Sequence, residues 1–422
     1  MSENSVRPLE YYENLDEIEL GRGNVISTLD LATYPGDYPV YSSSAVGTGE
    51  FGRYGRFMFD EELITWSIDG GGRPFYRPKH RYSVTNVCGY LRVKRPDLWN
   101  YRFLHALLEK LQSGIQFDYQ MKAHPSVIRE LYRFARVPLK AQETIGLILD
   151  TLDTAIQTTE AIIAKLKAVK QGLLHDLLTR GIDANGELRP PQAEAPHLYK
   201  ASPLGWIPKE WEVKQLADLL AAVEPAMRSG PFGSALLKQE LVEAGYPLLG
   251  IDNVHTEHFV ADYVRFVTPV KFVQLMRYAV RPHDLMITIM GTVGRCCLVP
   301  EDIGQALSSK HTWTISLDQE AYSPYLAMLQ VNYSPWVLAH FAKDQQGGTM
   351  AAIRSETLRS TRLPVPPRKE QLLMEERLRE ISKRIDLEGA LLAKCHAEKS
   401  GLMDDLLTGR VRVTPLLEAA AP

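Results

Sequence analysis

Apolar residues recur at steps of three, four and seven along two stretches of the chain, 138–179 and 367–408. This spacing places one narrow apolar stripe along a helix. Each stretch opens with a proline and runs out near a glycine, as helices commonly do. The pattern predicts two long amphipathic helices, each about 55 Å in length. The stripe positions are Ile145, Leu149, Leu152, Ile156, Ile163, Leu166, Leu173 and Leu177 in the first helix, and Met374, Leu378, Ile381, Ile385, Leu392, Cys395, Leu402 and Leu406 in the second.

The two stretches are copies of one another. They align without a gap at a constant offset of 229 positions, with more than a third of the residues identical, most clearly over 170–179 and 399–408. A narrow stripe buries little surface, so each helix needs a partner, and the other helix is the obvious one. We therefore expect the helices to pack antiparallel and to act as a spacer.

The segments before the helices are also related, though more weakly. Tyr38-Pro39-Val40 resembles Tyr246-Pro247-Leu248, and residues 63–73 resemble 285–295, each ending in Gly-Arg. These segments are rich in β-branched and aromatic residues interrupted by glycine and proline, which predicts mixed α and β domains. The expected fold class is α+β, with two mixed α/β domains separated by two long helices packed as an antiparallel coiled coil, in a pseudo-two-fold repeat. The expected divisions are a first domain (1–137), a first spacer helix (138–182), a proline-rich linker (183–208), a second domain (209–365), a second spacer helix (366–410) and a C-terminal tail (411–422).

Charge is informative locally rather than globally. The formal net charge is −3, which by itself does not indicate a nucleic-acid-binding protein. Residues 73–95, however, contain seven lysines and arginines and no acidic residue, and residues 263–295 contain five against the single acid Asp284. These stretches are either solvated basic loops or surfaces for a polyanion, for which a DNA duplex is a natural candidate.

Other site classes find little support in the sequence. The four cysteines form no C-x-x-C pair and have no histidine at zinc-finger spacing, so we expect reduced core residues and no metal site. No apolar run approaches the roughly 20 residues of a membrane helix. The first nine residues lack a signal-peptide pattern, so a cytoplasmic location is expected.

Catalytic motifs are also lacking. The sequence contains no Walker phosphate loop, no H-E-x-x-H and no G-x-S-x-G, and neither Pro-Pro pair precedes the aromatic residue of an amino-methyltransferase motif. The glycine-rich stretch 49–55 does not lie in a strand–turn–helix context. We therefore expect a chain without catalytic residues. One alternative is a coiled-coil protein-interaction scaffold without DNA readout.

The arrangement of domain, helix, linker, domain and helix resembles the specificity subunits of type I restriction-modification systems, in which two target-recognition domains alternate with two conserved helices. The resemblance spans nearly the whole chain. Its most specific motifs are Ser229-Gly-Pro-Phe-Gly-Ser234 with Lys238, the turn Gly291-Thr-Val-Gly-Arg295, and Leu363-Pro-Val-Pro-Pro-Arg-Lys-Glu-Gln371. The first half departs from the pattern, because it lacks Gly-Pro-Phe-Gly and has the unusual turn Asp69-Gly-Gly-Gly-Arg73.

The resemblance implies a DNA sequence-specificity subunit that recognises an asymmetric bipartite target and directs adenine methylation or cleavage by partner subunits. The implied partners are double-stranded DNA, two methyltransferase (modification) subunits and restriction/translocase subunits. No cofactor is expected on this chain; S-adenosylmethionine would belong to the methyltransferase, and ATP and magnesium to the restriction subunit. A component of a related system in which methylation and cleavage are fused is a further alternative, which the neighbouring genes would distinguish.

A recognition domain needs polar loops that bring side chains to base edges and phosphates. The candidate DNA-binding residues are Arg73, Asn86, Lys122 and His124 in the first domain, and Ser229, Lys238, Thr292, Arg295, Lys310, His311, Gln345 and Gln346 in the second. Each one alone is equally well interpreted as a solvated surface residue. Together they favour binding.

Overall fold

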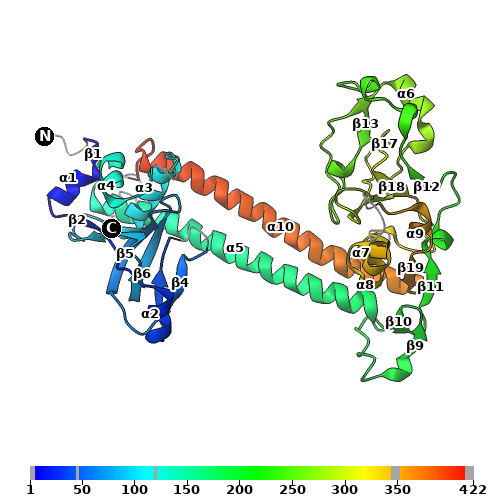
Figure 1. Cartoon of the computed structure of the whole chain (residues 1–422), viewed down its shortest axis with the longest axis horizontal. Helices are drawn as coiled ribbons and strands as arrows, with labels where there is room; N and C mark the ends of the chain where they lie inside the picture. Colours follow the sequence, from blue (N-terminus) through cyan, green and yellow to red (C-terminus); the bar gives the residue numbers. More distant parts are fainter. Residues whose placement is uncertain (1–4, 44–46, 118–120, 344–351, 414–422) are drawn as a thin grey trace, which may run out of the picture. The chain divides into compact units, whose positions relative to one another are not determined.

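The structure is a computed structural model that describes residues 5–43, 47–117, 121–343 and 352–413. The chain forms two compact units. The first comprises residues 1–163 and 387–422, and the second comprises residues 164–386. The two long helices, α5 (Leu139–Thr179) and α10 (Arg368–Leu407), each contribute one part to both units (Figure 1).

A six-stranded sheet forms the centre of the first unit, in the order β2-β7-β5-β6-β3-β4. All neighbours in this sheet are antiparallel except β3 and β6, where Val40 pairs with Ser83 in parallel. Helix α3 (Tyr101–Ser113) packs on the sheet, and its apolar side joins Trp66, Leu91 and Trp99 in one core. The strands are β2 (Ile18–Arg22), β3 (Tyr38–Tyr41), β4 (Glu50–Tyr54), β5 (Phe59–Ser67), β6 (Pro74–Val84) and β7 (Cys88–Val93).

Smaller elements complete the first unit. The short strands β1 (Arg7–Pro8) and β8 (Arg133–Phe134) pair antiparallel, and helices α1 (Leu9–Asn14) and α4 (Pro125–Leu131) lie beside them. Helix α2 (Thr28–Thr33) begins with a capping box, in which the Ser27 hydroxyl and the Asp30 carboxylate satisfy each other's backbone N–H groups.

The second unit repeats this topology in shorter strands. Its four-stranded sheet has the order β12-β18-β15-β16, which matches β2-β7-β5-β6. A three-stranded sheet, β14-β13-β17, matches β4-β3-β6, and its parallel pair, Leu248 with Leu307, matches the parallel pair of the first unit. The strands are β12 (Met227–Ser229), β13 (Tyr246–Leu249), β14 (Phe266–Val267), β15 (Leu285–Thr288), β16 (Cys296–Leu298), β17 (Leu307–Ser308) and β18 (Thr312–Ile315). The repeat expected from the weak similarity of these segments is confirmed.

The remaining helices and strands of the second unit surround these sheets. Strand β11 (Glu212–Gln215) pairs antiparallel with β19 (Arg362–Val365), the strand that leads into α10. The helices are α6 (Pro269–Gln274), α7 (Pro324–Tyr333), α8 (Pro335–Ala342) and α9 (Ser355–Arg359). Almost every side of α7 is buried, so it belongs to the core and not to the surface.

The two long helices lie antiparallel within each unit. In the first unit Ile145 and Leu149 of α5 share a core with Met403 and Leu406 of α10. In the second unit Leu174 and Leu177 share a core with Met374 and Leu378. Every residue of both predicted apolar stripes is buried or half-buried. The expected fold class, with two mixed domains and two long paired helices, is confirmed.

A buried glutamine at the start of each long helix ties that helix to the preceding domain. Gln371 donates to the carbonyl oxygens of Ala321 (3.2 Å) and Pro366 (2.8 Å) and accepts from the Ser323 backbone N–H (2.8 Å). Gln142, its counterpart at the offset of 229, makes the same three kinds of bond with Leu98, Val137 and Asn100. Ser323 and Asn100 are themselves the N-cap residues of α7 and α3. The glutamine therefore joins the ends of two helices in each unit.

A lysine near the end of the repeat makes a second equivalent link. Lys399 of α10 binds Glu109 (2.8 Å) and Asp153 (2.7 Å), and its counterpart Lys170 of α5 binds Glu257 (2.7 Å). Both lysines are largely buried. Both copies keep the lysine, but the carboxylates that neutralise it come from different elements.

The segment expected to be a linker is folded against the second unit. Arg189 forms a buried ion pair with Glu370, and the backbone N–H of Ile182 also donates to that carboxylate (2.9 Å). Strands β9 (Tyr199–Ser202) and β10 (Gly205–Pro208) then form a hairpin. The prolines of this segment therefore shape an ordered connection.

Three further features concern the cysteines, possible metal ligands and possible membrane-spanning helices. All four cysteines are buried and unpaired, and burial raises the pKa of the Cys88 and Cys297 thiols to about 12. Among the described residues no group of three or more histidine, cysteine, aspartate or glutamate side chains could hold a metal ion. In the same part of the chain, no helix is both long enough and apolar enough to cross a membrane.

Candidate nucleic-acid interface

Three loops meet at one edge of the second domain. The loop after β12 approaches the loop after β17, where the Gly230 N–H donates to the Ser309 carbonyl (3.1 Å). The Ile289 N–H, at the start of the turn 291–295 (the glycine turn of the second domain), donates to the His311 carbonyl (3.1 Å). A Cβ at Gly230 would lie 2.1 Å from the Ser308 carbonyl oxygen, so this approach requires glycine. The backbone thus brings Ser229, Lys310 and the glycine turn together.

A cavity of about 200 Å³ opens between these loops and gathers several predicted residues. Lys238, Lys310 and His311 line it, and the Ser229 hydroxyl lies 3.4 Å from the Lys310 carbonyl oxygen. Lys238 and Lys310 are exposed, and neither forms an ion pair within the described ranges. They are therefore available to phosphates.

The surroundings of His311 determine its protonation state. Burial, together with the positive charges of Lys310 and Arg265, lowers the pKa of its imidazole. The ring is consequently neutral at pH 7, so one nitrogen donates a hydrogen bond and the other accepts one. A neutral imidazole can contact base edges of either polarity.

The turn 291–295 carries Arg295, and the backbone at Ile289 joins the start of this turn to the loop of His311. Gly291 and Gly294 have φ angles of 73° and 90°, which favour glycine, and the Gly294 N–H donates to the Thr288 carbonyl (2.8 Å). The Arg295 N–H is held by the Thr288 hydroxyl (3.1 Å), while its guanidinium is half-exposed and forms no ion pair in the described part of the chain. The Thr292 hydroxyl is buried and lacks a partner there.

The first domain has a turn of different construction at the corresponding place in its fold. Its turn 69–73 lies between β5 and β6, and the Gly72 N–H donates to the Ser67 carbonyl (3.1 Å). Lys122 binds Asp69 in this turn (2.8 Å), and the adjacent Ala123 N–H donates to the Ile68 carbonyl (3.0 Å). Arg73 is exposed, with its guanidinium 5.5 Å from the centre of the Phe75 ring. The structure therefore brings Arg73 and Lys122 to one turn.

Two further candidates of the first domain have different surroundings. Asn86 lies in the turn between β6 and β7, next to Val87, whose carbonyl accepts from the Ile68 N–H (3.0 Å). His124 is the N-cap of α4, and its ring nitrogen accepts from the Ser126 N–H (3.3 Å). Asn86 therefore lies near the turn 69–73, whereas His124 already has a capping role. Gln345 and Gln346, predicted in the second domain, lie outside the described residues.

The basic stretch 73–95 is not a free basic surface. Arg77 is buried beneath Tyr41, with its guanidinium 3.6 Å from the ring centre. Four others form ion pairs: Arg81 with Asp60, Arg92 with Glu19 and Glu61, Lys94 with Asp16, and Arg95 with Asp97. These acids all lie outside the stretch, and three of them, Asp60, Glu19 and Glu61, lie on neighbouring strands, where a scan along the sequence does not find them. Arg73 and Lys79 form no ion pair with any described residue.

Ion pairs also lower the number of unpaired basic side chains in the second basic stretch, 263–295. Arg265 pairs with Asp252, and Lys271 pairs with Glu240 (2.7 Å). Sequence reasoning counted Arg265 in this stretch but missed it as a site residue, although it lines the cavity with Lys310 and its Nε is buried without a partner in the described part of the chain. Ser309 was also missed. Its hydroxyl is buried and has no hydrogen-bond partner among the described residues.

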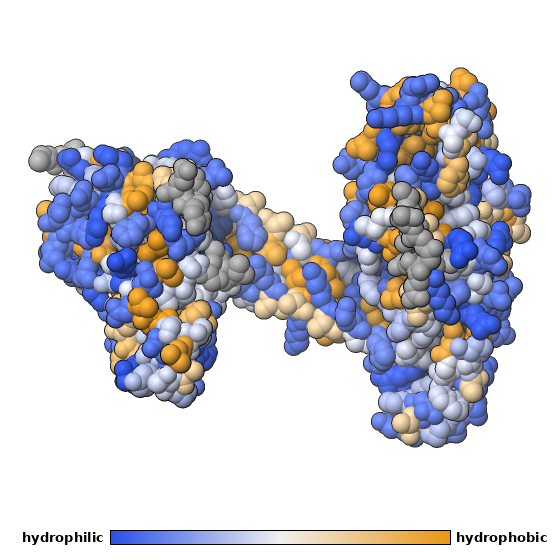
Figure 2. All heavy atoms as spheres, viewed as in Figure 1, coloured by the Kyte–Doolittle hydropathy of each residue, from blue (hydrophilic) through white to orange (hydrophobic). Residues whose placement is uncertain are grey.

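Hydrophilic residues cover most of the visible face of each domain, whereas the visible part of the long helices carries many apolar residues (Figure 2). The exposed apolar residues of the helices are Leu147, Ile162, Leu387 and Leu391 in the first unit, and Val169, Leu372 and Leu373 in the second. Exposed apolar residues mark a surface that binds other proteins where they gather into a contiguous patch.

The family model for the type I restriction modification DNA specificity domain matches residues 9–168 and 208–396, one match for each copy of the repeat. The chain belongs to this family of DNA specificity subunits. A type I restriction enzyme specificity subunit from Methanocaldococcus jannaschii is 23% identical over 362 residues, which cover 84% of this chain and 80% of the relative. Another from Mycoplasma pneumoniae is 30% identical over 171 residues, covering 39% of this chain and 51% of the relative.

The fold agrees with that of a solved specificity subunit. The crystal structure of the S subunit of a type I restriction-modification system from M. genitalium matches 96% of both chains, with a TM-score of 0.62 and 14% sequence identity. No comparison supports the alternative of a coiled-coil scaffold without DNA readout. As a specificity subunit, this chain acts with DNA and with other restriction-modification subunits.

Proposed function

We propose that the chain reads an asymmetric, bipartite DNA target, with one half-site for each domain, and directs adenine methylation or cleavage carried out by partner subunits. The observation that carries the proposal is the duplicated topology with different loops. The sheet order is kept in both units, but the loop 229–233 and the turn 291–295 of the second domain differ from the turn 69–73 of the first. Different loops on the same scaffold read different sequences.

The divisions proposed from the sequence assign these roles along the chain. Residues 1–137 and 209–365 would be the two recognition domains, and the helices within 138–182 and 366–410 would be the spacers. Lys238 and Lys310 are suited to phosphates, whereas Arg295 and His311 are suited to base edges. In the first domain Arg73 has the corresponding position after the glycine turn.

A domain exchange tests independent readout. Replacing residues 210–363 by the equivalent domain of a relative should change one half-site and leave the other unchanged. Methylome sequencing of cells that carry the exchanged subunit measures both halves at once. A change in both halves, or a palindromic target, would contradict the proposal.

The proposed partners are two methyltransferase subunits, which would use S-adenosylmethionine, and restriction/translocase subunits, which would use ATP and magnesium. We assign no cofactor and no catalytic residue to this chain. The exposed apolar residues of α5 and α10 support a docking surface for the methyltransferases, since each unit contains some of them. Native mass measurement of the co-expressed complex should show two methyltransferase chains per copy of this chain. A stable one-to-one complex would exclude this stoichiometry.

A further inference from the structure

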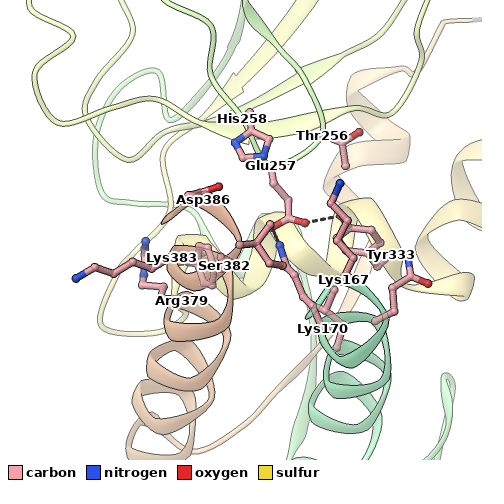
Figure 3. A pocket seen from close by; sticks show the side chains of 14 residues that line it. Lys167, Lys170, Thr256, Glu257, His258, Tyr333, Arg379, Ser382, Lys383 and Asp386 are labelled. Carbon is pink, nitrogen blue, oxygen red and sulfur yellow. Dashed lines mark hydrogen bonds and ion pairs between the residues drawn. The ribbon is translucent and has the colours of Figure 1, made fainter. Parts of the chain in front are cut away.

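A hollow of about 690 Å³ lies in the second unit, between α5, α10 and the loop 255–258 (Figure 3). Lys167 and Lys170 reach it from α5, and Arg379 and Lys383 from α10. Thr256 and His258 contribute from the loop. The hollow is separate from the cavity that carries Lys238 and Lys310, because the two share no lining residue.

Glu257 holds one wall of this hollow in place. Its carboxylate binds Lys170 (2.7 Å) and accepts a hydrogen bond from the Tyr333 hydroxyl, and its backbone N–H donates to the Cys296 carbonyl (3.0 Å). Glu257 has a φ angle of 65°, which is uncommon for a residue with a side chain. Three separate contacts therefore fix a strained residue, so the wall is preorganised.

The hollow has an excess of positive charge. Four lysines and arginines line it, against two carboxylates, Glu257 and Asp386. Glu257 forms an ion pair with Lys170. Arg379 forms an ion pair with Glu375 (2.7 Å), which does not line the hollow. Lys167 and Lys383 form no ion pair with any described residue. The amino groups of two lysines that line the hollow, Lys167 and Lys383, thus have no carboxylate partner among the described residues.

The first unit shows that this charge is not needed for helix packing. At the offset of 229, Arg379, Ser382 and Lys383 correspond to Asp150, Asp153 and Thr154. In the first unit Asp150 binds Arg102, and Asp153 binds Lys399 (2.7 Å). The same helix face is therefore acidic and internally neutralised in one copy. In the other copy it is basic, with Arg379 paired to Glu375 and Lys383 in no ion pair with a described residue. If helix packing required positive charge on this face, both copies would carry it.

We propose that this hollow binds a small phosphorylated ligand of nucleotide size, whose phosphates are held by Lys167, Lys383 and Arg379. Its volume is in the range of about 300–1,000 Å³ that is typical of small-molecule sites. Lysine and arginine supply charge-assisted hydrogen bonds to phosphate, and the hydroxyl of Thr256 is a neutral donor nearby. The rings of Tyr325 and Tyr333 also line the hollow and offer apolar surface to the remainder of the ligand. A hollow between two helices suits a free ligand better than the convex backbone of a duplex.

Isothermal titration calorimetry of the full chain with ATP and with inorganic pyrophosphate tests the site. Both probes should bind saturably, and the double variant Lys167→Gln/Lys383→Gln should weaken binding by about tenfold or more. The matched control is Lys165→Gln/Lys394→Gln, which removes the same charge from exposed positions of the same two helices outside the hollow. The control should bind both probes as the unaltered chain does. Circular dichroism melting checks that each variant is folded. If the double variant is not folded, the single variant Lys383→Gln replaces it.

Three outcomes would overturn the site. The first is the absence of saturable binding of either probe at millimolar concentration. The second is equal weakening in the double variant and its control, which would indicate general charge attraction. The third is displacement of ATP by a duplex oligonucleotide, with duplex binding weakened in the same variant, because the lysines would then serve the DNA backbone. Loss of DNA recognition alone would leave the nucleotide site untouched, since the probes contain no DNA.

Discussion

At the scale of single residues, Gln142 and Gln371 are the clearest link between sequence and structure. Each has less than 2% of its surface exposed and satisfies three backbone groups. Sequence reasoning registered the stretch from proline to glutamine as a family motif. The structure gives its physical reason, because the amide joins the start of the long helix to the N-cap of the helix before it.

Replacing Gln371 by alanine should lower the free energy of unfolding by about 2–4 kcal/mol, because buried backbone groups of Ser323, Ala321 and Pro366 lose their partners. Urea denaturation followed by circular dichroism measures the loss. Gln157→Ala, at an exposed position of α5, is the control and should change stability by less than about 0.5 kcal/mol. Equal effects in the two variants would show that the three hydrogen bonds do not anchor the helix.

Arg295 and Lys238 should have different effects on DNA binding. Arg295→Ala should reduce specific over non-specific affinity by about 1–3 kcal/mol, because a base-reading arginine distinguishes sequences. Lys238→Ala should weaken both kinds of binding equally and lower the salt slope by about one unit, because a phosphate contact does not depend on sequence. Fluorescence anisotropy over a range of salt, with the methylome-derived target and a scrambled duplex, separates the two.

The control for this pair is Lys394→Ala, an exposed lysine of α10 outside both candidate sites. It should leave affinity, specificity and salt slope unchanged. If Arg295→Ala weakens the target and the scrambled duplex to the same extent, Arg295 contacts phosphate and not a base. The role proposed for it would then be wrong.

At the scale of elements, the lysine link between the long helix and its domain should be visible in the pH dependence of stability. Burial alone would raise the pKa of the Glu109 carboxyl, but the hydrogen bond and charge of Lys399 outweigh it, so the pKa is lowered. A lowered pKa in the folded state stabilises the fold above the ordinary glutamate value of about 4.3. This contribution is lost as the pH falls through the lowered value.

Glu109→Gln should therefore be less stable than the unaltered chain by about 1 kcal/mol near neutral pH, and the difference should shrink on acidification below about pH 4.3. Urea midpoints between about pH 6 and pH 3 measure it. Glu143→Gln, at an exposed position of α5, should show no such convergence. A difference that stays constant with pH would mean that Glu109 acts through packing and not through its charge.

At the scale of the whole molecule, helix length should set the spacing between half-sites. Each long helix passes through both units, so extra turns lengthen the chain between the two recognition domains. Four residues inserted after Glu160, and four at the equivalent point after Gly389, add about 6 Å of helix and rotate the remainder of each helix by roughly one turn, which keeps the apolar stripe nearly in phase. The unread gap should grow by about one or two base pairs at about 3.4 Å per step, while both half-sites stay fixed.

Methylome sequencing of this four-residue variant determines the outcome. A two-residue insertion is the matched control, because it rotates the stripe by more than half a turn and should damage folding. An active four-residue variant with an unchanged gap would show that the helices do not set the spacing.

The sequence by itself determined the features that depend on local periodicity and on duplication. The apolar stripes predicted α5 and α10, and the repeat predicted two related domains, because side chains on one helix face recur at fixed steps and a copied segment folds as its original does. Glycines 291 and 294 likewise marked a turn that local backbone conformation requires. For these features the information lies within a few turns of chain or in the alignment of one half with the other.

Only the tertiary structure decided which charges are free. The stretch 73–95 contains no acid, yet Arg92 is neutralised by Glu19 and Glu61 because strand pairing places residues from distant parts of the chain side by side. Sheet register and loop approach also unite Lys238 with Lys310 and Arg265 around one cavity. Such pairings involve residues tens of positions apart, and their energy depends on burial and distance, which become defined only when the chain is folded.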